Sequence, residues 1–295
     1  MIEIKNVSMS YGSFKALNSV TLTVGDGSIY GLIGSNGSGK STLMRIMSGV
    51  FRANAGETEY NGKNVWENDR VKSQVVYLSD DWYFFPHDTL RETADFYASV
   101  YKNFSYERFE TLTEKFGLDP QRKVNTFSKG MTKQASVILA VSCDTQYILC
   151  DETFDGLDPM VRRAVKQVIA DEVAARSLTV VLSSHNLSEL EDICDHVALL
   201  HRGEVILESD VNDAKMNIYK VQTVLPNGTM PAGIEVLDRK DRGSLTTAIV
   251  RGSRNDIEEA FTLINPKFFE LIPLTLEEIF ITEMKEAGYE IDKVI

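Results

Sequence analysis

The chain has 295 residues, of which 43% are hydrophobic and 25% charged, and its net charge is −12. This composition is typical of a globular protein with a large core, and the acidic excess argues against a broad basic surface for nucleic acid. No apolar run is long enough to span a bilayer, so we expect any role at a membrane to depend on a partner. The three cysteines lack metal-ligand or redox spacing and fit a reducing cytosol.

Alternating apolar residues predict strands within residues 1–30, the last of which leads into the stretch Gly34–Thr42. A helix-forming segment follows, and this order of strand, glycine loop and helix is typical of a phosphate-binding P-loop. Glycines let backbone amides curl around phosphate oxygens, and the helix dipole favours the same anion. The loop residues predicted to contact phosphate are Gly34, Ser35, Asn36, Gly37, Ser38, Gly39, Lys40, Ser41 and Thr42.

Within this loop, two side chains have separate expected roles. Lys40 is expected to reach the β- and γ-phosphates, and the Ser41 hydroxyl can ligate Mg²⁺. Tyr11 lies in a predicted loop upstream and could stack on a nucleotide base, although a packing role would also explain it. The alternative for the glycine stretch is a strand-to-helix turn that binds no phosphate.

Residues 86–145 are predicted to be mainly helical, unlike the stretches on either side. Thr89 and Glu92 have the spacing of a capping box, and a second helix is expected to end near Gly117. Just upstream, a predicted buried strand at residues 75–78 is followed by Asp80 and the aromatic cluster 82–85.

Two further predicted strands end in residues suited to nucleotide chemistry. The apolar run at 147–150 ends in Asp151, a potential Mg²⁺ ligand, and Glu152, which could orient a water for attack on a phosphate. The run at 178–182 ends near His185, for which a phosphate contact is credible if the strands share one sheet. A solvated strand end and a structural histidine are the alternatives.

The composition changes after about residue 215. Strand-like pieces at 218–225 and 245–250 and helical pieces at 256–264 and 276–287 predict a small α/β accessory domain over residues 216–295. No residue of this segment suggests a chemistry.

Taken in order, these motifs resemble the ATP-binding subunit of an ABC transporter over residues 1–215. Residues 34–42 match the Walker A motif, residues 147–152 match Walker B with its catalytic glutamate, and residues 155–158 match the D-loop with Asp158. His185 matches the H-loop, and Tyr11 matches the aromatic residue that stacks on adenine. The resemblance implies an α/β fold of the P-loop NTPase (ABC ATPase) class. It comprises a RecA-like core, an antiparallel β lobe and a helical subdomain at about 86–145, followed here by the C-terminal α/β accessory domain.

The resemblance also implies a mechanism, cofactors and partners. Two cassettes would close head to tail on two ATP molecules, each with Mg²⁺, and closure would drive a separate transmembrane permease. The second cassette would be an identical or closely related subunit. Lys40, Glu152 and His185 would be catalytic, and Ser128 and Gly130 would contact the phosphate bound by the other subunit. The chain would then work at the cytoplasmic face of the cell membrane, held by the permease, with no nucleic-acid partner.

The sequence departs from the family pattern at two places, the signature segment and the Q-loop. The signature segment is Phe-Ser-Lys-Gly-Met at 127–131 instead of Leu-Ser-Gly-Gly-Gln, a variant that resembles bacitracin-type and antimicrobial- or cytotoxic-peptide exporters. Asp80 stands where most members place the Q-loop glutamine, and we expect it still to sense the metal. A soluble ABC ATPase acting on ribosomes or DNA and an importer subunit remain alternatives to the exporter.

Overall fold

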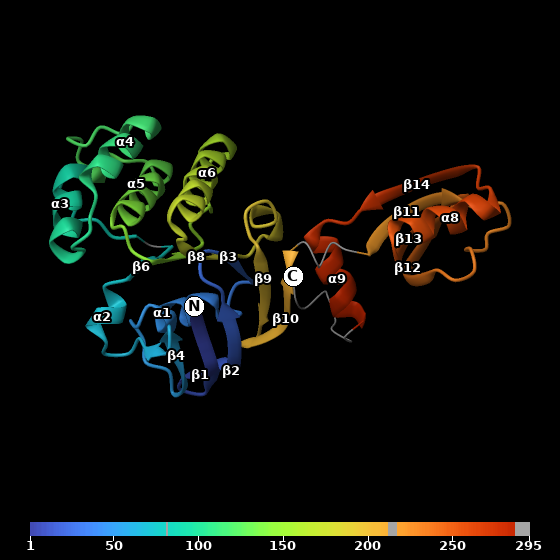
Figure 1. Ribbon diagram of the computed structural model, residues 1–295, viewed down its shortest axis with the longest axis horizontal. Coiled ribbons are helices and arrows are strands. Elements are labelled where there is room, and N and C mark those ends of the chain that lie inside the picture. The colour runs from blue at the N-terminus through green and yellow to red at the C-terminus, as the bar shows by residue number, and fades with distance from the viewer. Residues whose placement is uncertain (81, 212–216, 287–295) are drawn as a thin grey trace. The chain divides into compact units, whose positions relative to one another are not determined.

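The computed structural model describes residues 1–80, 82–211 and 217–286, and the chain divides into two compact units, residues 1–208 and 209–295 (Figure 1). The domain border expected after residue 215 lies outside the described residues. Each unit has its own sheets and helices. Among the described helices, none has both the length and the apolar character needed to cross a membrane.

An antiparallel sheet begins the first unit. It consists of β1 (Ile2–Tyr11), β2 (Phe14–Val24), β4 (Ala55–Tyr60) and β5 (Lys63–Asn64), in the order β2-β1-β4-β5. In the second half of β2, Val20, Leu22 and Val24 are buried and the threonines between them are exposed, as their apolar alternation predicts.

The second sheet of this unit is built on parallel pairs. Its order is β10-β9-β3-β8-β7-β6, and β3 pairs in parallel with β8 and β9, while β7 pairs in parallel with β6 and β8. The carboxyl ends of β3, β7 and β8 therefore meet at one edge, which is where open α/β sheets bind ligands. The strands are β3 (Ile29–Ile33), β6 (Val75–Leu78), β7 (Tyr147–Asp151), β8 (Thr179–Ser184), β9 (His196–His201) and β10 (Glu204–Asp210).

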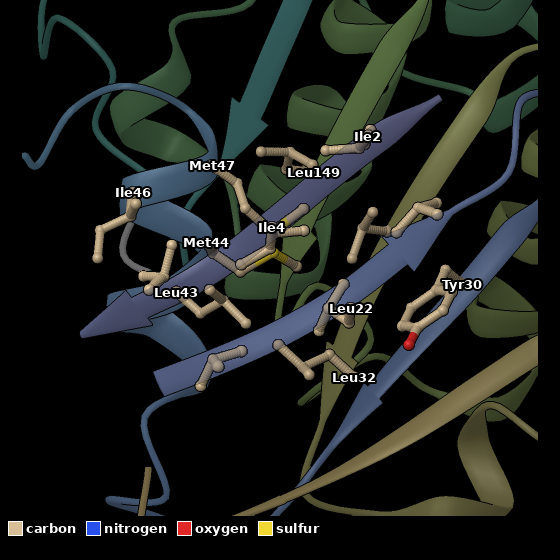
Figure 2. Packing of buried hydrophobic residues seen from close by; sticks show 14 of the residues in the cluster. Ile2, Ile4, Leu22, Tyr30, Leu32, Leu43, Met44, Ile46, Met47 and Leu149 are labelled. Carbon is tan, nitrogen blue, oxygen red and sulfur yellow. The ribbon is translucent and has the colours of Figure 1, made fainter. Parts of the chain in front are cut away.

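Helix α1 (Lys40–Met47) packs its apolar side chains into a core shared with both sheets. Leu43, Met44 and Met47 are fully buried among Ile2 and Ile4 of β1 and Leu149 of β7 (Figure 2). Burying each such side chain contributes about 1.5–3 kcal/mol, which fixes the start of the helix relative to the strand ends.

The four longer helices of the first unit, α3 to α6, lie on the far side of the six-stranded sheet from the antiparallel sheet (Figure 1). The expected capping box at Thr89 and Glu92 is present, and Gly117 ends a helix in the left-handed conformation, as predicted. These helices are α3 (Leu90–Val100), α4 (Tyr106–Phe116), α5 (Lys129–Ser142) and α6 (Pro159–Arg176). Shorter helical segments are α2 (Asp69–Lys72), η1 (Val124–Thr126) and η2 (Leu187–Glu189).

The second unit is an antiparallel sheet in the order β12-β13-β11-β14, with helix α8 packed on it. Val221, Val250, Ile257 and Phe261 are completely buried in its core. The strands are β11 (Ile218–Val224), β12 (Glu235–Arg242), β13 (Leu245–Arg251) and β14 (Phe268–Pro273), and the helices are α8 (Arg254–Ile264) and α9 (Leu276–Glu286). The last residue of the helix expected at 276–287 lies outside the described residues.

Candidate functional site

The glycine loop between β3 and α1 has a backbone that side chains would not allow. A Cβ on Gly34 would lie 2.3 Å from the Leu200 carbonyl oxygen, and one on Gly39 would lie 2.6 Å from that of Ala16. Gly39 also has φ 112°, a left-handed value that disfavours other residues. The loop therefore delivers the first amides of α1, which have no partners within the helix, at the carboxyl end of β3.

Lys40 is a buried cation at this loop. Only 3% of its side chain is exposed, and Nζ donates hydrogen bonds to the carbonyl oxygens of Gly34 at 2.7 Å and Ser35 at 3.3 Å. Nζ also lies 3.4 Å from Oε1 of Glu152. Because a buried ammonium group needs anionic or carbonyl partners, this position suits a phosphate oxygen entering from the adjoining cavity.

A cavity of about 230 Å³ opens beside Lys40. Two exposed aromatic rings, Tyr11 and Phe14, stand among its lining residues, together with the hydroxyls of Ser41 and Thr42 and two carboxylates. Apolar rings and anion-binding groups around one cavity fit a molecule with a flat base and a charged tail. The lining residues are Tyr11, Phe14, Ala16, Asn36, Gly37, Gly39, Lys40, Ser41, Thr42, Asp80 and Glu152. Gly34, Ser35 and Ser38 belong to the loop but not to this lining.

Asp151 is buried at the end of β7 with both carboxylate oxygens engaged. Ser183 Oγ donates to Oδ1 at 2.5 Å, and the Tyr77 hydroxyl donates to Oδ2 at 3.2 Å. Burial, and then the charge of Asp151, raise the pKa of Tyr77, so its hydroxyl stays protonated as a donor. The carboxylate is thus fixed in place, and its remaining lone pairs can accept from a metal-bound water.

Glu152 follows in a strained backbone conformation, with φ 47°. Its amide donates to Ser183 Oγ at 3.0 Å, and its carbonyl oxygen accepts from Lys133 Nζ at 2.8 Å. Its Oε2 lies 3.8 Å from Nδ1 of the partly exposed His185, which is also 3.5 Å from Asp155 Oδ2. The structure thus places Glu152 beside both Lys40 and His185, and the catalytic roles expected for the three residues stay predictions.

The predicted metal ligands differ in their placement. Ser41 and Asp80 line the cavity, and their oxygens are the hard ligands that Mg²⁺ prefers. Asp151 is not among the lining residues, so its contribution would pass through a water. The Asp80 carboxylate lies 3.3 Å from Lys133 Nζ, a contact that the sequence did not suggest. These donors fit a hard divalent cation, and their metal role remains a prediction.

Ser128, Gly130 and Asp158 are not among the residues that line the cavity. Ser128 caps α5, where its Oγ accepts from the Met131 amide at 3.3 Å. Asp158 caps α6 by accepting from the Met160 amide at 3.0 Å. Their expected contacts with nucleotide across a subunit interface stay predictions.

The sequence did not reveal four residues of this site: Phe14, Tyr77, Lys133 and Ser183. Tyr77 and Ser183 sit within apolar strands, and only the pairing of β7 with β6 and β8 brings their hydroxyls beside Asp151. Phe14 carries a usable signal, since it is an aromatic residue three positions after Tyr11 across a glycine turn. Lys133 has no such signal, because its partners come from distant parts of the chain.

Known proteins similar to this chain include ATP-binding proteins of ABC transporters. The family model described as ABC transporter matches residues 17–155. The chain is 28% identical over 287 residues to the ABC transporter ATP-binding protein YtrB of Bacillus subtilis (strain 168), covering 96% of this chain and 98% of YtrB. It is also 28% identical over 211 residues to the bacitracin transport ATP-binding protein BcrA of Bacillus licheniformis, covering 70% of this chain and 69% of BcrA.

A solved structure, that of an ATP-binding subunit of an ABC transporter, superposes with a TM-score of 0.67 at 27% identity. It covers 73% of this chain and 92% of the other. The family resemblance and the fold class expected from the sequence are therefore confirmed.

Proposed function

We propose that this chain, which carries an ATPase domain of the ABC transporter family, hydrolyses ATP in the cavity beside Lys40 to drive export through a separate membrane permease. The observation that carries the proposal is the buried Lys40 ammonium, 3.4 Å from Glu152 and open to a cavity flanked by aromatic rings. The Lys40 ammonium can bind a phosphate there, while the Glu152 carboxylate accepts a proton from the water that attacks this phosphate.

In this proposal, Lys40 and the loop amides bind the phosphates, and Tyr11 stacks on the base. Mg²⁺ would neutralise charge between the phosphates, with Ser41, Asp80 and Asp151 as the residues that would hold it. Glu152 accepts a proton from the attacking water, and His185 orients the carboxylate and the transferred phosphate. The short distances between Lys40, Glu152 and His185 support these assignments.

A second copy of the chain, or a close homologue, completes the site. Ser128 caps α5, so the positive end of that helix dipole stands at the segment predicted to meet phosphate. We expect Ser128, Gly130 and Asp158 to act across the interface, because none of them lines the cavity of their own chain.

The aromatic cluster at residues 82–85 supports permease docking. Tyr83 is 71% exposed and Phe85 46%, and Phe85 also contacts the exposed Phe96 ring at 5.5 Å. Trp82 instead stacks on Tyr97 at 6.1 Å. The cluster therefore divides into an inner ring that packs and outer rings that can anchor a partner. Docking there would hold the chain at the cytoplasmic face of the membrane.

The similarity to BcrA, which is named for bacitracin transport, supports export and a peptide or drug as cargo. The variant signature segment at residues 127–131 and the presence of a second unit after the ATPase domain also favour an exporter. Evidence that the chain serves an importer, or that it acts on ribosomes or DNA, would contradict this part of the proposal.

The test is affinity capture from the native host. The tagged Glu152→Gln variant, solubilised in mild detergent with Mg²⁺ and ATP, should retain a stoichiometric polytopic membrane protein. Lys40→Met is the matched control and should retain less, because it cannot be trapped with ATP. Recovery of ribosomes or DNA-bound proteins without a membrane protein would overturn the proposal.

Reconstitution of the captured permease with this chain then tests direction. ATP added on the side of the ATPase should move cargo away from that side. Movement toward that side, dependent on a separate substrate-binding protein, would instead identify an importer.

A further inference from the structure

Lys133 on α5 joins two parts of the candidate site. Its side chain is 17% exposed, and Nζ lies 2.8 Å from the carbonyl oxygen of Glu152 and 3.3 Å from Oδ1 of Asp80. Asp80 comes from the loop after β6, and Glu152 follows β7. One ammonium group thus connects the helical layer to two loops that line the cavity.

The contact falls on the backbone of a strained residue. Glutamate rarely adopts a left-handed conformation, so φ 47° at Glu152 persists only where neighbouring groups hold it. The Glu152 amide donates to the hydroxyl and the carbonyl oxygen of Ser183. The Glu152 carbonyl oxygen accepts from Lys133 Nζ at 2.8 Å and from the Asp155 amide at 3.2 Å. The peptide groups on both sides of the residue are therefore held, and with them the Cα–Cβ bond from which the carboxylate extends.

Asp80 supplies the negative charge that this arrangement needs. A lysine that donates only to a carbonyl oxygen keeps an unpaired ammonium, which favours full hydration. The neighbouring carboxylate balances this charge with a charge-assisted contact and keeps Nζ next to Glu152.

We infer that Lys133 is a positioning residue for Glu152, because it holds the Glu152 backbone by a hydrogen bond to the carbonyl oxygen. Asp80 in turn holds the Lys133 ammonium, so the position of Glu152 also depends on the loop after β6. This inference rests on the proposed ATPase function. It assigns Asp80 a task beyond metal sensing. A shift of α5 relative to β7 would move the Glu152 carbonyl and thereby change the rate of hydrolysis.

The first experiment compares steady-state ATP hydrolysis by the full-length wild type, Lys133→Met and Lys133→Gln. Lys133→Met should lower kcat about tenfold or more with less than about a threefold change in KM for ATP, because only the orientation of Glu152 is lost. Lys133→Gln keeps one donor for the carbonyl and should fall in between. Lys5→Met, which removes a lysine paired with Glu59 in the antiparallel sheet, is the matched control and should leave both constants unchanged.

The second experiment separates positioning from a general structural effect. In a Glu152→Gln background, single-turnover hydrolysis with enzyme in excess should show no further loss when Lys133 is replaced by Met, since both changes act through one residue. The thermal midpoint of each variant is recorded. If Lys133→Met does not fold, Lys133→Gln carries the comparison.

Hydrolysis by Lys133→Met within twofold of the wild type would overturn the inference while leaving the ATPase proposal intact. An equal fold-loss in the wild-type and Glu152→Gln backgrounds would also overturn it. A wild-type chain without ATP hydrolysis would overturn the proposed function itself.

Discussion

The two units of this chain use charge and backbone strain differently. In the first, a nearly buried lysine, a buried aspartate and a left-handed glutamate gather at one sheet edge. In the second, the left-handed residues other than glycine in the described part are Asn217 and Asn265, a residue type that tolerates this conformation. Its paired charges, such as Lys220 with Glu278, lie at least partly in solvent.

Left-handed residues such as Glu67 and Arg202 also occur in turns of the first unit, so the contrast rests on the gathering of strain and buried charge at the sheet edge. Strain and buried charge cost stability and persist where surrounding contacts hold them. The second unit shows a different pattern, an apolar core in which the buried polar residues of its described part are threonines. We therefore expect substitutions at the sheet edge of the first unit to affect turnover more than stability, and core substitutions in the second unit to do the reverse.

The largest expected effect is on stability in the second unit. Phe261 is completely buried and stacks on Phe269 at 4.7 Å between ring centroids. Phe261→Ala should destabilise this unit by about 3–5 kcal/mol through lost burial and the resulting cavity. Urea unfolding followed by circular dichroism measures the loss, and basal ATP hydrolysis should stay within about twofold. A matching collapse of hydrolysis would break the contrast between the units.

A smaller effect, on both stability and kcat, is expected at Ser183. Its hydroxyl donates to Asp151 and accepts from the Glu152 amide. Ser183→Ala should cost about 1–3 kcal/mol of stability, because a buried carboxylate oxygen loses a donor. It should also lower kcat about tenfold by loosening Glu152.

Ser184→Ala is the matched control for this substitution, since that buried hydroxyl bonds with Glu189 and the Asn186 amide instead. Its kcat should fall clearly less than that of Ser183→Ala. Equal losses in the two variants would show that any buried serine of β8 matters equally, against our account.

The smallest effect is expected at Tyr77, whose hydroxyl lies at the longer distance of 3.2 Å from Asp151. Tyr77→Phe should cost about 1 kcal/mol of stability and lower kcat a few-fold, since Ser183 still donates to the carboxylate. Tyr101→Phe removes a hydroxyl that donates to the Val75 carbonyl on the same strand and should leave kcat unchanged. Identical kcat values for the two variants would remove Tyr77 from the site.

The sequence predicts those parts of the site that depend on residues close together in the chain. The glycine loop, the Asp151–Glu152 pair and the Thr89 capping box each have a local physical cause, so spacing alone indicates them. Tyr77 and Ser183 reach Asp151 only through strand pairing, and Lys133 meets Glu152 only through the packing of α5 against the sheet at β6. Local patterns do not encode such distant contacts, nor the strand order of the second unit.

The most direct test of the account is equilibrium binding and hydrolysis of ATP with Mg²⁺ by the purified chain. The wild type and Lys5→Met should bind and hydrolyse ATP alike, whereas Lys40→Met should bind at least about thirtyfold more weakly, since losing a charged partner costs about 2–5 kcal/mol. Equal ATP affinity of Lys40→Met and the wild type would contradict the placement of the phosphates beside Lys40.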